Sequence, residues 1–192
     1  MEPVQDLVRI LLERDGYFVR SDVRFSVPGI TPTGKTAAYS DLDIIAIKYD
    51  ADDGLVSDRI WAEVKAHLTS SLTAGYLRGF KSDFATLLDL DKVDLSSSER
   101  KKYALRQKLA IQKATGLLGR GFRRVLYFGG KIPMDKGDAA KRLLLRGVEV
   151  IYVRELVKDK LRSLTHLEGN EPLVRIINTL AAYDLVADDS NM

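Results

Sequence analysis

The spacing of apolar residues changes along the chain and marks out its elements. Over residues 3–15 apolar side chains recur every three or four positions, which predicts a helix. Over residues 17–27 every second residue from Val23 is apolar, which predicts a strand. The same rules predict further strands at 41–49, 59–66, 125–130 and 148–153, and further helices at about 70–89, 98–118, 136–146, 154–164 and 172–186.

The order of these elements is helix, three strands, helices, strand, helix and strand. Short connections make the first strands antiparallel, whereas helical crossovers join the later ones, so we expect an α/β fold with a mixed sheet. Residues 1–156 are predicted to form the α/β core, with a helical insertion at about 70–120. Residues 157–192 are predicted to form a C-terminal helical extension of the same domain.

Composition narrows the class of protein. The 192 residues are 45% hydrophobic and 30% charged, which suits one domain with a buried core. The chain has no cysteine, so disulfides, thiolate metal sites and a cysteine nucleophile are excluded, and a cytoplasmic location is expected. No apolar run approaches the ~18 residues of a membrane span, and the acidic, amphipathic start does not read as a signal peptide.

A loop with the sequence GITPTGKT, from Gly29 to Thr36, matches the spacing of a phosphate-binding P-loop. Such a loop needs a helix directly after it, because the helix N-terminus faces the phosphates. Here only four residues separate Thr36 from the strand predicted to begin at Asp41. We therefore expect a strand-connecting loop and no nucleotide cofactor, and nucleotide binding is kept only as an alternative.

The candidate chemistry lies on the two strands around the turn at 51–54. If that hairpin is symmetric about Asp53, Asp43 lies opposite Glu63 and Asp41 lies opposite Lys65. Regular alternation also places Asp41 and Asp43 on one face with Ile45.

Opposed carboxylates destabilise a sheet unless a cation lies between them, and hard oxygen ligands suit Mg²⁺ or Mn²⁺. Lys65 could help activate a water molecule there, and Asp41 could assist the metal ion, pair with Lys65 or cap the preceding loop. The alternative is a solvent-facing hairpin with ordinary acid–lysine pairs.

Asp43 followed by IIAI, together with AEVK at 62–65 on the next strand, resembles the PD-(D/E)XK nuclease superfamily. Residues 4–20 and 125–156 resemble the opening and closing elements of its archaeal, Mrr-type and Holliday-junction-resolvase-like members. The resemblance covers most of the first 156 residues. It implies the restriction-endonuclease-like αβββαβ core, a mixed central sheet flanked by helices, here with extra C-terminal helices.

The resemblance also implies roles for individual residues. Asp43 and Glu63 would bind Mg²⁺, with Mn²⁺ as a substitute, and Lys65 would be the catalytic lysine. Many relatives carry a glutamate on the first helix where this chain has Gln5. A glutamine could hold water or metal through its carbonyl oxygen but brings no charge.

Between residues 100 and 124 the chain has basic residues and no acidic one. Such a block neutralises nucleic-acid phosphates, although a solvated helix face is the commoner use of a charge run. The block comprises Arg100, Lys101, Lys102, Arg106, Lys108, Lys113, Arg120, Arg123 and Arg124.

Together these features predict a Mg²⁺-dependent DNA endonuclease. The alternative is a catalytically inactive nucleic-acid-binding domain that retains the nuclease fold, which Gln5 favours. DNA is the expected partner and a membrane is not. A homodimer would suit double-strand cleavage, but the sequence does not require one.

Overall fold

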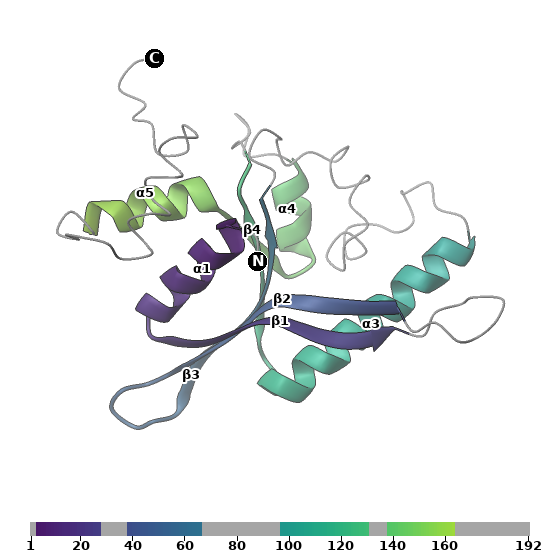
Figure 1. Cartoon of the computed structure of the whole chain (residues 1–192), viewed down its shortest axis with the longest axis horizontal. Helices are drawn as coiled ribbons and strands as arrows, with labels where there is room; N and C mark the ends of the chain where they lie inside the picture. Colours follow the sequence, from purple (N-terminus) through teal and green to yellow (C-terminus); the bar gives the residue numbers. More distant parts are fainter. Residues whose placement is uncertain (1–2, 28–37, 67–96, 131–137, 164–192) are drawn as a thin grey trace, which may run out of the picture.

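The computed structural model describes residues 3–27, 38–66, 97–130 and 138–163 (Figure 1). Its helices are α1 (Pro3–Arg14), α3 (Ser97–Leu118), α4 (Asp138–Leu145) and α5 (Val153–Ser163). Its strands are β1 (Tyr17–Val27), β2 (Ala38–Tyr49), β3 (Val56–Lys65), β4 (Arg123–Phe128) and β5 (Val148–Tyr152). The predicted helices at 70–89 and 172–186 and the loop from Gly29 to Thr36 lie outside the described residues.

One five-stranded sheet in the order β1-β2-β3-β4-β5 forms the centre of the molecule. β1 with β2 and β2 with β3 pair antiparallel, whereas β3 with β4 and β4 with β5 pair parallel. The predicted α/β class and mixed sheet are therefore confirmed. Parallel neighbouring strands require a crossover connection. Helix α3 forms part of that crossover between β3 and β4.

The bounds of β2, β3 and β4 differ from the predicted ones by up to three residues. β2 begins three residues early, because Ala38 pairs with Val27 at the end of β1 and their backbone bonds do not need an apolar pattern. β3 likewise begins at Val56, which pairs with Tyr49. β4 spans 123–128 instead of 125–130, since Arg123 already pairs with Ile60.

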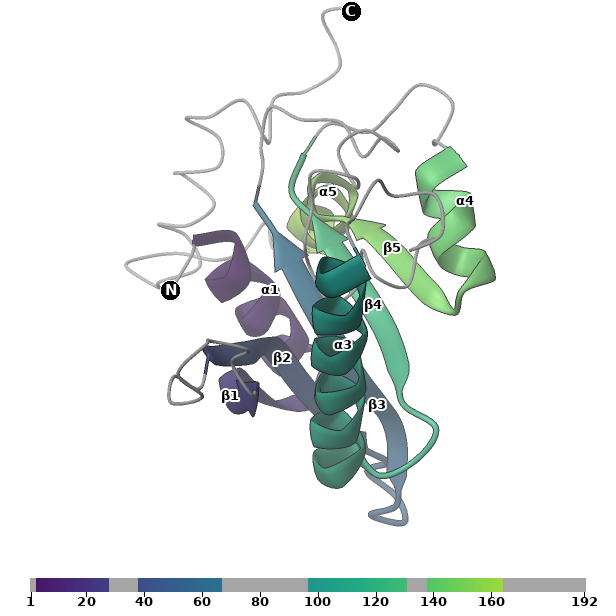
Figure 2. The same cartoon turned by 90° about the vertical axis from the view of Figure 1, so that its right-hand side faces the viewer.

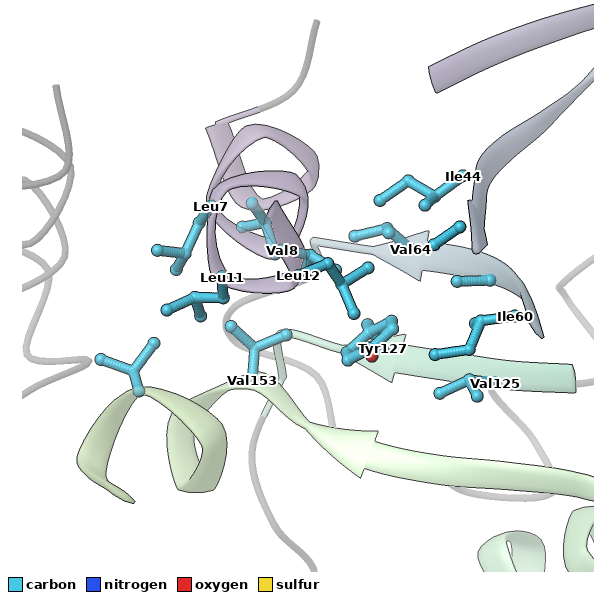
Figure 3. Close-up of a cluster of buried hydrophobic side chains, with 14 residues drawn as sticks. Leu7, Val8, Leu11, Leu12, Ile44, Ile60, Val64, Val125, Tyr127 and Val153 are labelled. Atoms are coloured by element: carbon cyan, nitrogen blue, oxygen red, sulfur yellow. The ribbon is translucent and has the colours of Figure 1, made fainter. Parts of the chain in front are cut away.

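Helices α1 and α5 cover one face of the sheet (Figure 1). Leu7, Val8, Leu11 and Leu12 of α1 point toward Val153 and the sheet, as Figure 3 shows. We call this cluster the α1-side core; it also includes Ile44, Ala46, Ile60, Ala62, Val64, Val125, Tyr127 and Val157. Burial of each leucine contributes about 1.5–3 kcal/mol, so the stripe on α1 fixes that helix against the strands.

Helices α3 and α4 cover the opposite face (Figure 2). The α3-side core contains Ala110, Ala114 and Leu118 of α3, Leu143 of α4, and the strand residues Val23, Phe25, Val27, Leu42, Ile45, Trp61, Leu126, Phe128, Val148 and Tyr152. The small alanines of α3 allow this helix to lie close to the sheet. Among the described helices, none combines the length and apolar character that a bilayer crossing demands.

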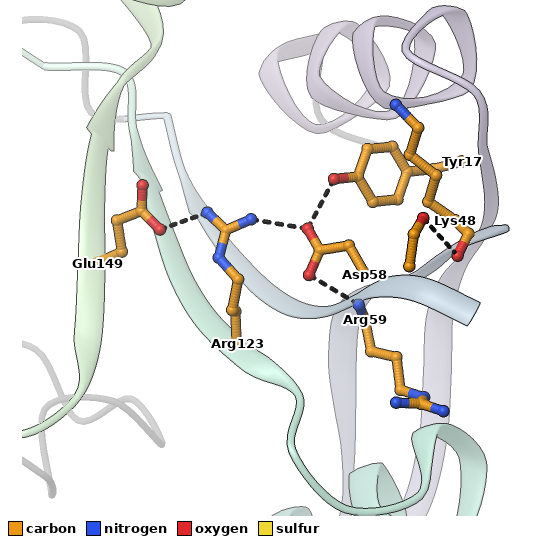
Figure 4. A network of polar contacts seen from close by, with 7 residues as sticks. Tyr17, Lys48, Asp58, Arg59, Arg123 and Glu149 are labelled. Atoms are coloured by element: carbon orange, nitrogen blue, oxygen red, sulfur yellow. Dashed lines mark hydrogen bonds and ion pairs between the residues drawn. The ribbon is translucent and has the colours of Figure 1, made fainter. Parts of the chain in front are cut away.

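A polar network joins side chains of β1, β3, β4 and β5 at the end of the sheet where β4 begins (Figure 4). The hydroxyl of Tyr17 and Nη1 of Arg123 both donate to Asp58 Oδ2, each at 2.7 Å. Nη2 of Arg123 donates to Glu149 on β5, and the N–H of Arg59 donates to Asp58 Oδ1 at 2.8 Å. Burial and the bond to Asp58 raise the pKa of Tyr17 to about 12. Asp58 is therefore the common acceptor that links β1, β3 and β4.

Replacing Asp58 by alanine is expected to lower the free energy of unfolding by about 2 kcal/mol, because it leaves the Tyr17 hydroxyl and one Arg123 nitrogen without their acceptor. Denaturant unfolding measures this change. Asp52→Ala, in the exposed turn between β2 and β3, is the matched control. Equal stability of both variants would contradict the prediction.

Candidate active site

The candidate site lies where strand β2 separates from strand β3. Their register runs from Tyr49 opposite Val56 to Ile44 opposite Ala62. It places Ile45 opposite Trp61, as the predicted hairpin symmetry requires, but the ladder ends at Ile44, so the predicted strand pair of Asp43 with Glu63 is not formed. Past this point β3 continues only beside β4, so Asp43 lies one step beyond the last β2–β3 pair.

Asp43, Glu63 and Lys65 converge at this point. Lys65 Nζ lies 2.9 Å from Glu63 Oε1 and 3.9 Å from Asp43 Oδ2. The backbone N–H of Val64 donates to the same Asp43 Oδ2 at 2.7 Å, which ties the aspartate to β3 across the separation. The structure thus brings together the three side chains that the sequence singled out, two carboxylates with one ammonium group.

Burial dominates the electrostatics of the site. The side chain of Asp43 is 20% exposed and that of Glu63 only 10%. Burial, opposed by the charge of Lys65 and reinforced by the charge of Glu63, raises the pKa of Asp43 to about 7. The unliganded site therefore holds a proton on Asp43 through a wide pH range, and an added cation would displace it.

The donor set fits a hard divalent cation. Among the described residues, Asp43 Oδ1 and Glu63 Oε2 accept no hydrogen bond, so each carboxylate keeps one oxygen for a ligand. Within those same residues no cluster of three or more acidic or histidine side chains surrounds a common point. Two protein carboxylates suit Mg²⁺, which keeps several waters and accepts phosphate oxygens.

A glycine allows β4 to approach the backbone of Lys65. The N–H of Gly129 donates to the Lys65 carbonyl oxygen at 2.8 Å. A Cβ atom at position 129 would lie 3.3 Å from that oxygen and 3.3 Å from Ala66 Cα. This close contact fixes the end of β3, and with it the origin of the Lys65 side chain.

Gln5, the predicted first-helix contributor, reaches this site with its amide nitrogen. Gln5 Nε2 donates to the carbonyl oxygen of Asp43 and to Oδ1 of Asp22, each at 3.0 Å. The Gln5 side chain is buried in the first turn of α1. Its amide therefore contacts the backbone that carries Asp43.

The predicted common face of Asp41, Asp43 and Ile45 is wrong. Leu42 packs in the α3-side core and Ile44 in the α1-side core, although regular alternation would put both on one face. The strand therefore changes face at Asp43. Asp41 is exposed and lies opposite Arg24 of β1, beyond the β2–β3 ladder that was expected to bring it opposite Lys65.

The basic block is divided between two parts of the fold. Arg106, Lys108 and Lys113 lie on α3, whose first turns also carry residues 100–102. Arg123 lies at the start of β4, five residues before Phe128, the partner of Lys65, and thus about 16 Å from the site along the strand.

Two arginines at the start of β4 have partners within the fold. Arg123 bonds Asp58 and Glu149, and Arg124 donates to the carbonyl oxygen of Arg146 at 2.8 Å. Burial lowers the pKa of Arg124. Arg123 and Arg124 thus both bond to other parts of the fold. Arg120 lies in the short segment between α3 and β4.

Asp22 is the site neighbour that the sequence reading missed. It lies in β1 with φ of 52°, in the left-handed region that few residues other than glycine adopt. The sequence contained a signal for an irregular backbone at Asp22, because aspartate is a poor strand former and here interrupts a run that otherwise predicts a strand.

No protein-family model, curated protein or solved structure matched the chain in comparisons with known proteins. The functional interpretation therefore rests on the geometry of Asp43, Glu63 and Lys65 and on the resemblance of the motif that carries them.

Proposed function

We propose that this protein is a Mg²⁺-dependent DNA endonuclease with a restriction-endonuclease-like fold. The observation that supports it most is the convergence of Asp43, Glu63 and Lys65 at the separation of β2 and β3, with Lys65 Nζ 2.9 Å and 3.9 Å from the two carboxylates. A helix, three antiparallel strands and two crossover-joined parallel strands around this point accord with the αβββαβ core that the motif implies.

Asp43 and Glu63 would hold the metal ion through the carboxylate oxygens that have no partner within the described residues. When bound, Mg²⁺ supplies a positive charge that stabilises the additional negative charge on the phosphate under attack. Mn²⁺ would substitute for it, because both ions prefer oxygen ligands.

Lys65 acts on the nucleophile and on the phosphate. Its ammonium group donates hydrogen bonds that orient an attacking water and offset negative charge on the phosphate oxygens. The bond between Val64 N–H and Asp43 Oδ2 holds the aspartate within reach of the same point. The basic residues of α3 are proposed to contact the DNA backbone, which gives affinity without base specificity.

A second candidate function is that of a catalytically inactive DNA-binding domain. The observation that favours it is Gln5, whose amide hydrogens are both directed to acceptors within the fold. In this case the two carboxylates with Lys65 form a structural ion-pair cluster. The domain would then bind DNA and bind no divalent cation.

Cleavage of duplex, flap and junction DNA in the presence of Mg²⁺ or Mn²⁺ tests the proposal. We expect product with the wild type and a loss of at least about 10²-fold in Asp43→Ala. Asp52→Ala, which removes an exposed aspartate of the turn, serves as the control and should cleave like the wild type. Equal cleavage by Asp43→Ala and wild type refutes the assigned site. DNA binding with neither cleavage nor Mn²⁺ binding supports the second candidate.

A further inference from the structure

Asp22 holds an unusual backbone conformation in the middle of a strand. Its φ of 52° is the only positive value of a residue other than glycine in the described part of the chain. Aspartate and asparagine tolerate this region better than most residues other than glycine, yet it remains unfavourable inside a strand. Contacts around Asp22 must therefore maintain it.

The side chain of Gln5 makes one of these contacts and connects it to Asp43. Gln5 Nε2 donates one hydrogen to Asp22 Oδ1 and the other to the carbonyl oxygen of Asp43, both at 3.0 Å. Because a carboxylate and a carbonyl can only accept, the nitrogen of the amide must face them. Gln5 is 8% exposed, so its amide is shielded from water, whereas the Asp22 acceptor is exposed.

The two residues that Gln5 joins lie across from each other in the β1–β2 ladder. Ser21 pairs with Ile44 and Val23 pairs with Leu42, so Asp22 and Asp43 occupy the position between these pairs. It is also the position where both strands change face. Val19 contacts the α1-side core and Val23 belongs to the α3-side core, just as Ile44 and Leu42 belong to different cores.

The consequence concerns the direction of the Asp43 side chain. A regular strand would continue the β2–β3 ladder past Ile44, whereas here β2 separates from β3 and follows β1 over α3. Where β2 has separated from β3, Asp43 Oδ2 accepts the N–H of Val64.

We propose that Asp22 is a positioning residue for the site: with Gln5 it clamps the bend of β1 and β2 and so directs the Asp43 carboxylate toward Glu63 and Lys65. This inference rests on the proposed function for its catalytic consequence, but the positioning itself can be measured without catalysis. It also assigns Gln5 a role in this chain that a glutamate could not fill, because a glutamate has no hydrogen to donate to either acceptor.

Three substitutions separate the effect of the Asp22 carboxylate, the effect of its backbone conformation and the effect of the Gln5 hydrogen bonds. Asp22→Gly removes the carboxylate but adopts the left-handed backbone readily. Asp22→Asn keeps both an acceptor for Gln5 and a residue type that tolerates positive φ. Gln5→Leu keeps a buried side chain of similar size and removes both hydrogen bonds. Ser26→Gly, at an exposed position of the same strand, controls for the effect of a glycine.

Hydrogen exchange of the Val64 amide reports the position of Asp43 directly, since that N–H donates to Asp43 Oδ2. We expect exchange on the order of 10-fold faster in Asp22→Gly and Gln5→Leu, and unchanged exchange in Asp22→Asn and Ser26→Gly. We also expect kcat for DNA cleavage to fall by up to about 10²-fold in the first two variants, with KM for DNA unchanged. The double variant should be no worse than Gln5→Leu alone, because Gln5→Leu already removes the bond that Asp22→Gly removes.

Wild-type exchange of Val64 in Asp22→Gly would overturn the inference. Asp22→Asn behaving like Asp22→Gly would also overturn it, because the charge and not the bond would then matter. If the wild type cleaves no DNA, the proposed function fails, whereas the exchange of Val64 still decides whether Asp22 positions Asp43.

Discussion

Lys65→Met is expected to reduce Mg²⁺-dependent DNA cleavage by about 10²–10³-fold while leaving Mn²⁺ binding intact. Methionine has a similar length but no charge and no donor. Among the described residues, Lys65 is the cation that pairs with both carboxylates, so its loss removes the group that would orient the nucleophile and offset charge on the phosphate. The same loss leaves Asp43 and Glu63 without their counter-charge, which favours a bound divalent cation.

Two measurements on the same variant test this expectation. Cleavage rates at saturating Mg²⁺ give the catalytic effect, and calorimetric titration with Mn²⁺ gives the affinity of the site. Lys48→Met is the matched control, because Lys48 lies on β2 about 16 Å along the strand from Asp43. Loss of cleavage together with loss of Mn²⁺ binding would contradict the separate roles of the lysine and the carboxylates.

Asp43→Asn is expected to stabilise the metal-free protein at pH 8 by about 2–4 kcal/mol and to leave its stability at pH 4 nearly unchanged. Burial raises the pKa of Asp43 from 3.8 to about 7. Between these values the folded state binds a proton that the unfolded state has released. The stability contributed by this carboxyl is therefore complete below about pH 4 and is lost as pH rises through about 7.

The size of the expected stabilisation follows from the same shift in the pKa of Asp43. Three pH units correspond to about 4 kcal/mol, which is an upper value because Lys65 and water around the carboxylate can relax. An asparagine still accepts the Val64 N–H through its Oδ1 and carries no charge at any pH, so the penalty above pH 7 disappears.

Thermal unfolding between pH 4 and pH 8 without divalent ions measures this difference. A change of this size corresponds to roughly 5–15 °C in Tm for a chain of this length. Asp52→Asn, at an exposed turn, should follow the wild type at every pH. A stability difference of the same size at pH 4 and pH 8 would show that charge burial is not its cause.

Much of this fold is encoded in local patterns. The apolar stripe from Val4 to Leu12 predicted α1, because that helix buries one face, and the alternation from Val23 to Val27 predicted β1. The turn ending at Gly54, with φ of 70°, fixed the hairpin and hence the pairing of Ile45 with Trp61. The relative directions of the strands also followed, since short connections give antiparallel strands and helical crossovers give parallel ones.

The candidate residues were found from the sequence, whereas their environment was not. Spacing placed Asp43 and Glu63 near each other. It did not show that β2 leaves β3 just before Asp43, that Val64 N–H binds the aspartate, or that Arg123 bonds Asp58. These contacts join residues distant in the chain, and no local pattern records them.

The sequence alone determined the helices and strands of the described residues and their order along the chain. It also determined which acidic and basic side chains were available for chemistry. Both depend on local periodicity and residue type. Only the tertiary structure decided the bend at Asp22 and Asp43, the use of the Gln5 amide as its clamp, and the burial that raises the pKa of Asp43. The physical reason is that a left-handed backbone residue and a buried carboxyl persist only where packing from distant elements holds them.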